Sequence, residues 1–212
     1  LVQLAEMKGS EVEISDVYSI FFAVRDHLKI MRNCVIDLDP ERRERDLMRR
    51  THSASLMREK WQGYTDGNVR LEYTSDYDGG ISSSCLEFST VERAVYNLVN
   101  NAIAHTADGI VQLFVTVLEP AEPENVKIAT ANAIAEEELS RVRDTFGSDH
   151  GRLFEGGFSI GGTGVGLSVA ARMVARAYGV ESIRRAIEDG YVGAEVRETV
   201  FIAWMHWPVW HE

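Results

Sequence analysis

The sequence contains little cysteine, has no excess of positive charge and lacks long apolar runs. Its two cysteines, Cys34 and Cys85, have neither the spacing of a metal-binding motif nor the number needed for a disulfide framework. A reducing, cytoplasmic setting is therefore expected. Lysine and arginine together number 22 against 33 aspartates and glutamates, and the resulting net charge of −11 argues against a nucleic-acid-binding scaffold.

No apolar stretch approaches the ~18 residues that a membrane-spanning helix needs, and no signal peptide is visible. Because the chain starts at Leu1 rather than at a methionine, we expect it to be a piece of a longer protein. The hydrophobic share of 45% over 212 residues is that of a globular protein with a substantial core. We find no internal repeat and no low-complexity segment.

The apolar periodicities predict a mixture of helices and strands. Helices are predicted over residues 16–31, in a basic segment near 41–62, and over 89–106, 135–147 and 167–179. Strands are predicted at 12–14, within 65–80, at 110–120, at 125–133, and twice within 181–208. A proline-bearing turn joins the strands at 110–120 and 125–133 as a hairpin. This pattern predicts the α+β class, with one sheet and helices on one of its faces.

Three asparagines lie on the helix predicted over 89–106, although asparagine is a poor helix former. Asn97, Asn101 and His105 are four residues apart, so they share a helix face that is offset from the apolar stripe. Such a face would point into a cleft between helix and sheet. Amide oxygens can coordinate a hard cation and amide NH groups can hold phosphate oxygens, whereas the alternative is a merely solvated polar face.

A group of glycines immediately precedes the helix predicted over 167–179. Gly162, Gly164 and Gly166 allow the backbone to approach a phosphate closely, and the free NH groups of a helix N-terminus favour an anion. Flexible turns can have the same composition. The segment is not a dinucleotide-binding fingerprint, because no strand leads directly into it.

Taken in order, these motifs resemble the ATP-binding domain of sensor histidine kinases, which belongs to the GHKL ATPase superfamily together with gyrase, Hsp90 and MutL. YNLVNNAIAHT (96–106) resembles the N box, LFEGGF (153–158) the F box and GGTGVGL (161–167) the G2 box. The resemblance covers roughly residues 12–208. It implies the Bergerat fold, a two-layer α/β sandwich with a mixed, mostly antiparallel sheet, in which 182–187 and 199–208 look like the closing strands.

The same resemblance implies a domain organisation. Residues 1–10 would be the end of an upstream dimerisation helix or a linker. Residues 11–212 would form the ATP-binding domain, with a basic insertion near 41–62.

The resemblance also implies roles for the candidate site residues. Asn101 would hold the Mg²⁺ that bridges the ATP phosphates. Asn97 would stand where hydrolysing members carry a glutamate; because an amide cannot take up a proton, the site would suit phosphoryl transfer to a protein side chain rather than to water. The remaining residues would line the phosphates and ribose or form the hinge of a lid over ATP: His105, Thr106, Gly162, Thr163, Gly164, Gly166 and Leu167.

One departure from the family pattern concerns the adenine. Family members carry an aspartate and two glycines after the strand that follows the N box, whereas here Asn132 stands at the position of the aspartate and both glycines are missing. The amide oxygen of Asn132 can still accept a hydrogen bond from the adenine amino group, but a neutral acceptor is weaker than an ionised one. The glycine-rich loop 147–161, with few apolar anchors, would be the lid.

The resemblance thus implies the ATP-binding catalytic domain of a two-component sensor histidine kinase. It would pass a phosphoryl group to a histidine on the dimerisation hairpin of its own homodimer, and from there to the receiver domain of a response regulator. His27 and His52 lack the acidic residue that follows the phosphoacceptor in this family. The alternatives are a pseudokinase or phosphotransfer scaffold without ATP, and an anti-sigma-type serine kinase. The setting would be cytoplasmic, or the cytoplasmic part of a membrane-bound sensor, with no nucleic-acid partner.

Overall fold

The computed structural model describes residue 31 and residues 52–82, 89–117, 119, 123–158 and 164–210. Apart from Met31, all of these belong to the unit Met48–Glu212, which is separate from the unit Leu1–Leu47. The strand predicted at 12–14 lies outside the described residues. So does the helix predicted at 16–31, except for Met31, which is helical.

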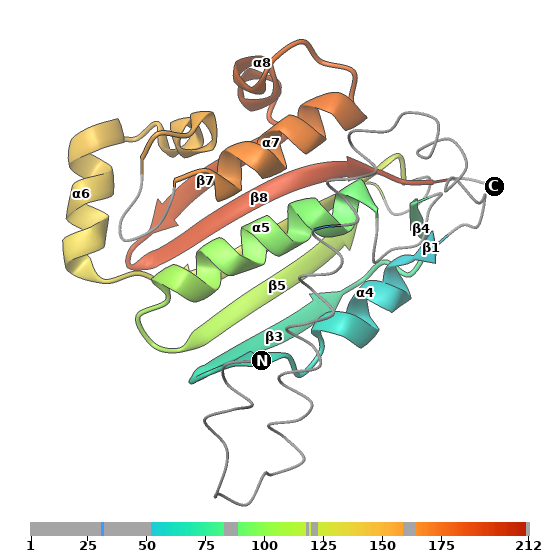
Figure 1. Ribbon diagram of the computed structural model, residues 1–212, viewed down its shortest axis with the longest axis horizontal. Coiled ribbons are helices and arrows are strands. Elements are labelled where there is room, and N and C mark those ends of the chain that lie inside the picture. Colours follow the sequence, from blue (N-terminus) through green and yellow to red (C-terminus); the bar gives the residue numbers. More distant parts are fainter. Residues whose placement is uncertain are drawn as a thin grey trace, which may run out of the picture. The chain divides into compact units, whose positions relative to one another are not determined.

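A six-stranded sheet with the strand order β2-β3-β5-β6-β8-β7 is the scaffold of this unit (Figure 1). Strands β3 and β5 are parallel, with Leu71 opposite Val111, and the other neighbouring pairs are antiparallel. A small separate sheet pairs β1 (His52–Ser53) with β4 (Gly80–Ser82). The six strands are β2 (Thr65–Asp66), β3 (Val69–Ser75), β5 (Ile110–Val117), β6 (Asn125–Ala133), β7 (Val192–Arg197) and β8 (Val200–Pro208). The predicted α+β class with a mixed, mostly antiparallel sheet is confirmed.

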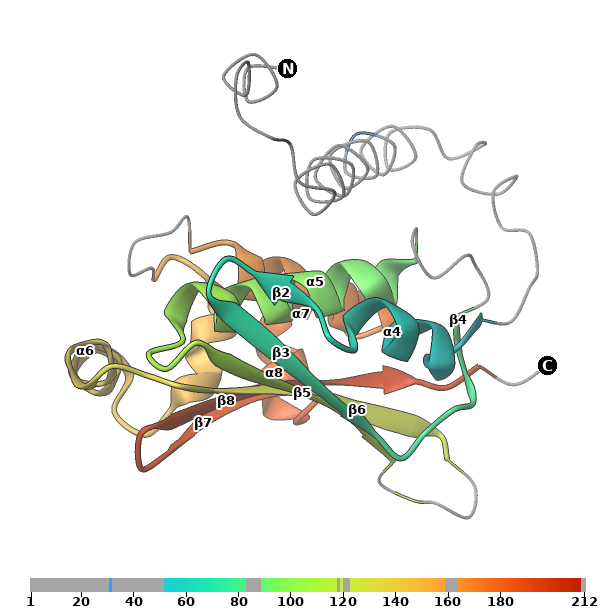
Figure 2. The same ribbon diagram turned by 90° about the horizontal axis from the view of Figure 1, so that it is seen from below.

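Two helices, α5 (Thr90–His105) and α7 (Gly166–Ala177), pack side by side over one face of this sheet (Figures 1 and 2). Ser89 caps α5, since its Oγ accepts a hydrogen bond from the backbone NH of Glu92 at 3.2 Å. The inner face of α5 is fully buried, as its apolar spacing predicts, through Val91, Val95, Leu98 and Ala102. The polar face of the same helix is therefore turned away from the core.

The strands of the sheet direct alternate side chains to the helices. In β5 and β6 the buried apolar residues on the helix side are Val111, Leu113, Val115, Val126 and Ile128. Asn132 has the same parity as Val126 and Ile128, so its side chain lies on the helix side, opposite Val111 in the register.

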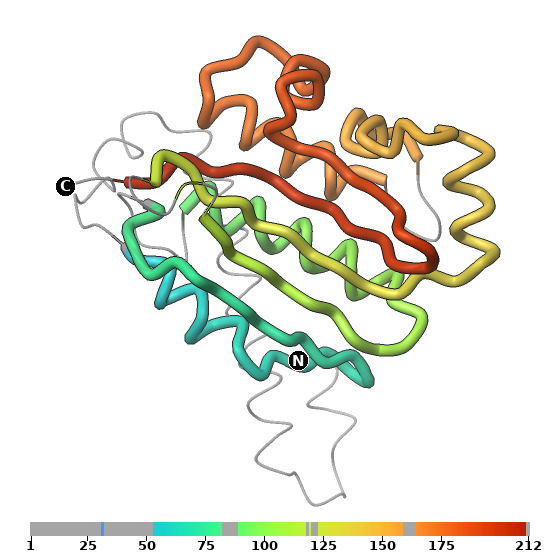
Figure 3. Tube along the Cα trace, turned by 180° about the vertical axis from the view of Figure 1, so that it is seen from behind, coloured from blue at the N-terminus to red at the C-terminus, as the bar shows by residue number. Residues whose placement is uncertain are grey.

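The opposite face of the sheet is seen in Figure 3, where the strands lie in front of the helices. On this face the Trp204 ring packs closely against Gly193: an added Cβ at Gly193 would lie 2.4 Å from the indole ring, so only glycine allows this contact. The Lys127 ammonium lies 4.5 Å from the centre of the same ring, a cation–π contact.

Helix α4 (Ala54–Trp61) corresponds to the second half of the basic segment predicted near 41–62. Its Ala54, Met57 and Trp61 are buried in the core, and the Trp61 ring makes an edge contact with Tyr64 at 5.2 Å. This part of the predicted insertion therefore builds the domain core, whereas residues 41–51 lie outside the described part.

The prediction that 182–187 forms a closing strand is wrong. These residues begin helix α8 (Ile183–Glu188), which starts where the Ser182 Oγ accepts a hydrogen bond from the Arg185 NH at 3.1 Å. An ion pair between Arg185 and Asp189, four residues apart, supports the helix. The strand β7 follows later, so the edge of the sheet is formed by residues that come after this helix.

A second difference concerns the predicted loop 147–161. After α6 (Glu136–Phe146), residues His150–Glu155 form a 3₁₀ helix, η2, that packs against α7, α8 and β7. Phe154 in this segment is completely buried. Within the segment predicted to be a lid with few apolar anchors, η2 is therefore held to the domain through Phe154. Within the described chain, no helix is long and apolar enough to cross a membrane.

Candidate functional site

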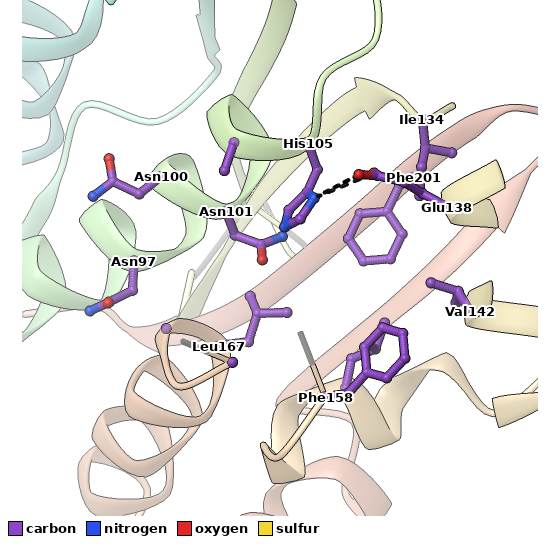
Figure 4. A pocket seen from close by; sticks show the side chains of 14 residues that line it. Asn97, Asn100, Asn101, His105, Ile134, Glu138, Val142, Phe158, Leu167 and Phe201 are labelled. Atoms are coloured by element: carbon purple, nitrogen blue, oxygen red, sulfur yellow. Dashed lines mark hydrogen bonds and ion pairs between the residues drawn. The ribbon is translucent and has the colours of Figure 1, made fainter. Parts of the chain in front are cut away.

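A pocket of about 220 Å³ lies between α5, α6, η2, the beginning of α7 and β8 (Figure 4). Its wall combines three amide side chains, an imidazole–carboxylate pair, two glycines and a group of apolar side chains. The lining residues are Asn97, Asn100, Asn101, Ala104, His105, Ile134, Glu138, Val142, Leu153, Phe158, Gly164, Gly166, Leu167 and Phe201.

The polar face of α5 supplies the amide end of the pocket. Asn97, Asn101 and His105 are spaced by four residues and line the same cavity, as their spacing predicts. The Nδ2 of Asn97 donates a hydrogen bond to the carbonyl oxygen of Arg93 at 2.8 Å, which fixes the orientation of the amide. The amide oxygen of Asn97 consequently faces Gly166, where an added Cβ would lie 3.7 Å from it.

The beginning of α7 forms the wall next to these amides. Gly164 has a φ of +67°, a left-handed conformation that favours glycine, and Gly166 is the first residue of the helix. The unpaired NH groups of this first turn, together with the helix dipole, favour an anion. The backbone at Gly156, just after η2, lies close to Ser168 of α7. An added Cβ at Gly156 would come within 3.1 Å of the serine Cβ, so the absence of a side chain permits this close approach.

The other end of the pocket is apolar and carries one ion pair. Ile134, Val142 and Phe201 lie around it, and Glu138 projects from the first turn of α6 (Figure 4). The Nδ1 of His105 lies 3.3 Å from Oε2 of Glu138 and 3.5 Å from Oε1. These two side chains, 22% and 24% exposed, connect α5 to α6 within the wall of the pocket.

The charge of the pocket is unusual for an anion site. Among the described residues that line it, none is lysine or arginine, and Glu138 is the only carboxylate. The described part of the chain also holds no cluster of three or more metal-ligating His, Cys, Asp or Glu residues. Amide oxygens are nevertheless suitable ligands for a hard cation such as Mg²⁺, which keeps several waters and takes further oxygens from bound phosphates. The residues present therefore fit a cation that arrives with a phosphate ligand.

Six of the predicted site residues meet in this pocket: Asn97, Asn101, His105, Gly164, Gly166 and Leu167. Thr106 does not line it. This residue ends α5, and its Oγ1 lies within hydrogen-bond distance of the Asp108 carboxylate at 2.9 Å and of the carbonyl oxygen of Ile110 at 3.0 Å. Gly162 and Thr163 lie outside the described residues.

Asn132 is buried in β6, with 3% of its surface exposed, and it is not among the lining residues. Its Nδ2 donates to the carbonyl oxygen of Ala133 at 3.1 Å, whereas its Oδ1 is buried without a hydrogen-bond partner. A buried acceptor without a partner is costly. The adenine-binding role of Asn132 stays a prediction.

Sequence reasoning missed several lining residues. Glu138 and Val142 are four residues apart on α6, so the sequence could have indicated that they share a helix face. However, the three consecutive acidic residues at 136–138 are also explained by the helix dipole, which favours negative charge in the first turn, so nothing marks Glu138 as a site residue. Phe201 reaches the pocket only because β8 pairs with β6, which places it opposite Asn132. The residues next to Phe201 in the sequence therefore do not indicate that it lines the pocket.

Comparison with known proteins gives a match to one family model. Residues 88–208 match the family described as histidine kinase-, DNA gyrase B-, and HSP90-like ATPase. None of the curated proteins matches the sequence significantly.

Among solved structures, the catalytic domain of histidine kinase ThkA is similar at 18% identity, with a TM-score of 0.45, over 74% of this chain and 86% of that domain. The Acinetobacter baumannii histidine kinase AdeS shows 13% identity and a TM-score of 0.43 over 99% and 92% of the two chains. The histidine kinase domain of the E. coli osmosensor EnvZ shows 16% identity and a TM-score of 0.42 over 77% and 91%.

Proposed function

Since the chain belongs to the family of histidine kinase-, DNA gyrase B- and HSP90-like ATPases, we propose that it binds Mg-ATP in the pocket between α5 and α7. The observation that carries the proposal is the convergence of the α5 amides and the α7 N-terminus on one cavity. One wall offers amide groups for a cation and phosphates, and the other offers backbone NH groups for an anion. The apolar end beyond them suits a flat base.

The phosphates would lie at the amide end. Asn101 would provide an oxygen to Mg²⁺, and the first turn of α7 with Gly164 and Gly166 would donate NH groups to phosphate oxygens. A Mg²⁺ ion held there with the nucleotide would supply neutralisation of the phosphate charge. His105 would lie between the phosphate side and the base side, and Leu167 would cover the cavity from α7. Gly162 and Thr163 would belong to the same phosphate-binding segment.

The reaction would be phosphoryl transfer to a protein side chain. Asn97 faces Gly166 at the beginning of α7, so it would lie beside the phosphates. Its amide, already bonded to the carbonyl oxygen of Arg93, cannot accept a proton from water. Transfer would therefore depend on positioning of the γ-phosphoryl group and on charge stabilisation. We propose a histidine on a dimerisation hairpin as the acceptor and the receiver domain of a response regulator as the next recipient, in the cytoplasm.

Isothermal titration of the 212-residue chain with Mg-ADP tests the binding. Micromolar or tighter binding is expected, and its absence would favour the alternative of a scaffold that has kept the fold without nucleotide. The absence of lysine and arginine among the described lining residues is the observation that favours this alternative.

An ATP hydrolysis assay tests the reaction type. The wild-type chain should hydrolyse Mg-ATP only at background rate, whereas Asn97→Glu introduces a carboxylate beside the phosphates and should raise the rate. A wild-type rate as high as that of the variant would contradict the assignment of Asn97. With a supplied histidine hairpin, an acid-labile phosphoprotein would support histidine transfer, and an acid-stable one would indicate a serine kinase.

A further inference from the structure

Glu138 stands out because no role in the proposed nucleotide site uses it. It is the one carboxylate among the described residues that line the pocket, and it lies at the end formed by Ile134, Val142 and Phe201 (Figure 4). A carboxylate beside a site for a polyanion opposes binding through charge repulsion. A hydrogen-bond donor on the ligand that meets this carboxylate would offset the repulsion.

The position of this carboxylate is defined by His105. The Nδ1 of the imidazole lies 3.3 Å from Oε2 and 3.5 Å from Oε1, and both side chains are about three-quarters buried. An ionised carboxylate can accept about four hydrogen bonds. The contact with His105 therefore orients Glu138 and leaves it capacity to accept from a ligand.

A second candidate acceptor is Asn132, which lies opposite the pocket residue Phe201 in the sheet. Its Oδ1 is buried without a partner, and the residue does not line the cavity, so a ligand in the pocket meets Glu138 first. Moreover, the Nδ2 of Asn132 already donates to the carbonyl oxygen of Ala133, which fixes the amide. An ionised acceptor also forms a stronger hydrogen bond than a neutral amide.

We propose that the Glu138 carboxylate accepts a hydrogen bond from the 6-amino group of adenine and thereby selects adenine nucleotides, with His105 as the positioning residue. This inference rests on the proposed binding of ATP. Adenine fits the surroundings, because it combines a flat apolar ring with an amino group that has two NH donors. In this arrangement the specificity for the base comes from α6 rather than from the end of β6.

Titration with two nucleotides tests the inference: Mg-ADP, and the Mg complex of purine riboside 5′-diphosphate, which lacks only the 6-amino group. The wild-type chain should prefer ADP by about tenfold or more. Glu138→Gln should lower this preference about fivefold, because a neutral acceptor replaces a charged one. Glu138→Ala should bring the preference close to one. Removal of the negative charge alone would strengthen the binding of both nucleotides, because it relieves repulsion of the phosphates. A loss of affinity for ADP only would instead indicate the loss of a hydrogen bond to the 6-amino group.

Glu137→Gln is the matched control. It removes the same charge from the same turn of α6, but the Glu137 side chain is 80% exposed, pairs with Arg141 and does not line the pocket. Its preference for ADP should equal that of the wild type. His105→Phe should reduce the preference in part, and it should have no further effect once Glu138 is alanine.

Each contrary outcome has a distinct meaning. Equal wild-type affinity for the two nucleotides would overturn the role of Glu138 and leave the ATP site intact. Loss of the preference in Asn132→Ala but not in Glu138→Ala would assign the amino group to Asn132. Failure of the wild-type chain to bind either nucleotide would overturn the proposed function and this inference with it.

Discussion

Asn101 illustrates how a single side chain can matter for a ligand and not for the fold. It lines the pocket and is not part of the buried core of α5. Asn101→Ala should therefore abolish Mg²⁺-dependent nucleotide binding and leave the thermal midpoint unchanged or slightly higher, because alanine is the better helix former. Calorimetric titration and thermal unfolding measure the two effects.

The control for this prediction is a titration in the absence of Mg²⁺. With EDTA in place of Mg²⁺, wild type and Asn101→Ala should bind ADP equally weakly, because the lost interaction is the one that the cation provides. Unchanged Mg-ADP affinity in the variant would contradict the assignment of Asn101 as the metal ligand.

His206 provides a prediction about pH. Burial, and secondarily the nearby Lys127 ammonium, lower the pKa of His206 below its ordinary value of 6.5. The unfolded chain therefore binds more protons than the folded one near and below pH 6.5, so this residue makes the free energy of unfolding fall as the pH drops through that range. Urea unfolding from pH 5 to 7.5 should show a smaller decrease for His206→Gln than for wild type. An identical pH dependence would mean that His206 is equally protonated in both states.

At the scale of elements, we expect the packing of η2 on the domain to depend on one side chain, that of Phe154. Phe154 is fully buried, and the η2 segment that carries it packs against α7, α8 and β7, so Phe154→Ala should destabilise the domain by about 3–5 kcal/mol. Arg152→Ala, two residues earlier on the same 3₁₀ helix, changes a side chain that is 54% exposed and should alter stability by less than about 0.5 kcal/mol. Urea denaturation compares them, and similar midpoints for both variants would contradict the role of Phe154 as an anchor.

The elements differ in how far the sequence predicts them. Helix α5 was predictable because its apolar residues keep the 3.6-residue period over four turns and Ser89 caps it. Helix α8 was not, since six residues are too few for a period to decide between helix and strand. The glycine-rich composition of 147–161 concealed η2, because the burial of Phe154 depends on α7, α8 and β7, which come later in the chain.

The part of the candidate site that could be predicted is the part that a single helix, α5, supplies. The shared face of Asn97, Asn101 and His105 follows directly from their spacing of four residues. The apolar and acidic end is assembled from β8, α6 and η2, so Glu138 and Phe201 are brought together by strand pairing and helix packing rather than by a local motif.

For the whole molecule, residues Met48–Glu212 form one of the two compact units into which the chain divides. A fragment comprising residues 48–212 should therefore unfold cooperatively, with a thermal midpoint within a few degrees of that of the full chain, and should bind Mg-ADP with the same affinity. Thermal unfolding by circular dichroism and calorimetric titration check the two properties. Loss of cooperative unfolding would show that residues 1–47 complete the core.

The interior position of β8 has a consequence for the order of folding. This strand follows every other element of the sheet in sequence, yet it pairs with β6 on one side and β7 on the other. Its pairing with β6 brings Phe201 opposite Asn132, although α6, η2, α7, α8 and β7 lie between them in sequence, and such long-range closure is entropically costly and slow. A nascent chain cannot complete the pocket until residue 201 has left the ribosome, and until then the β6 edge that pairs with β8 lacks this partner; an unpaired edge of this kind promotes pairing between chains.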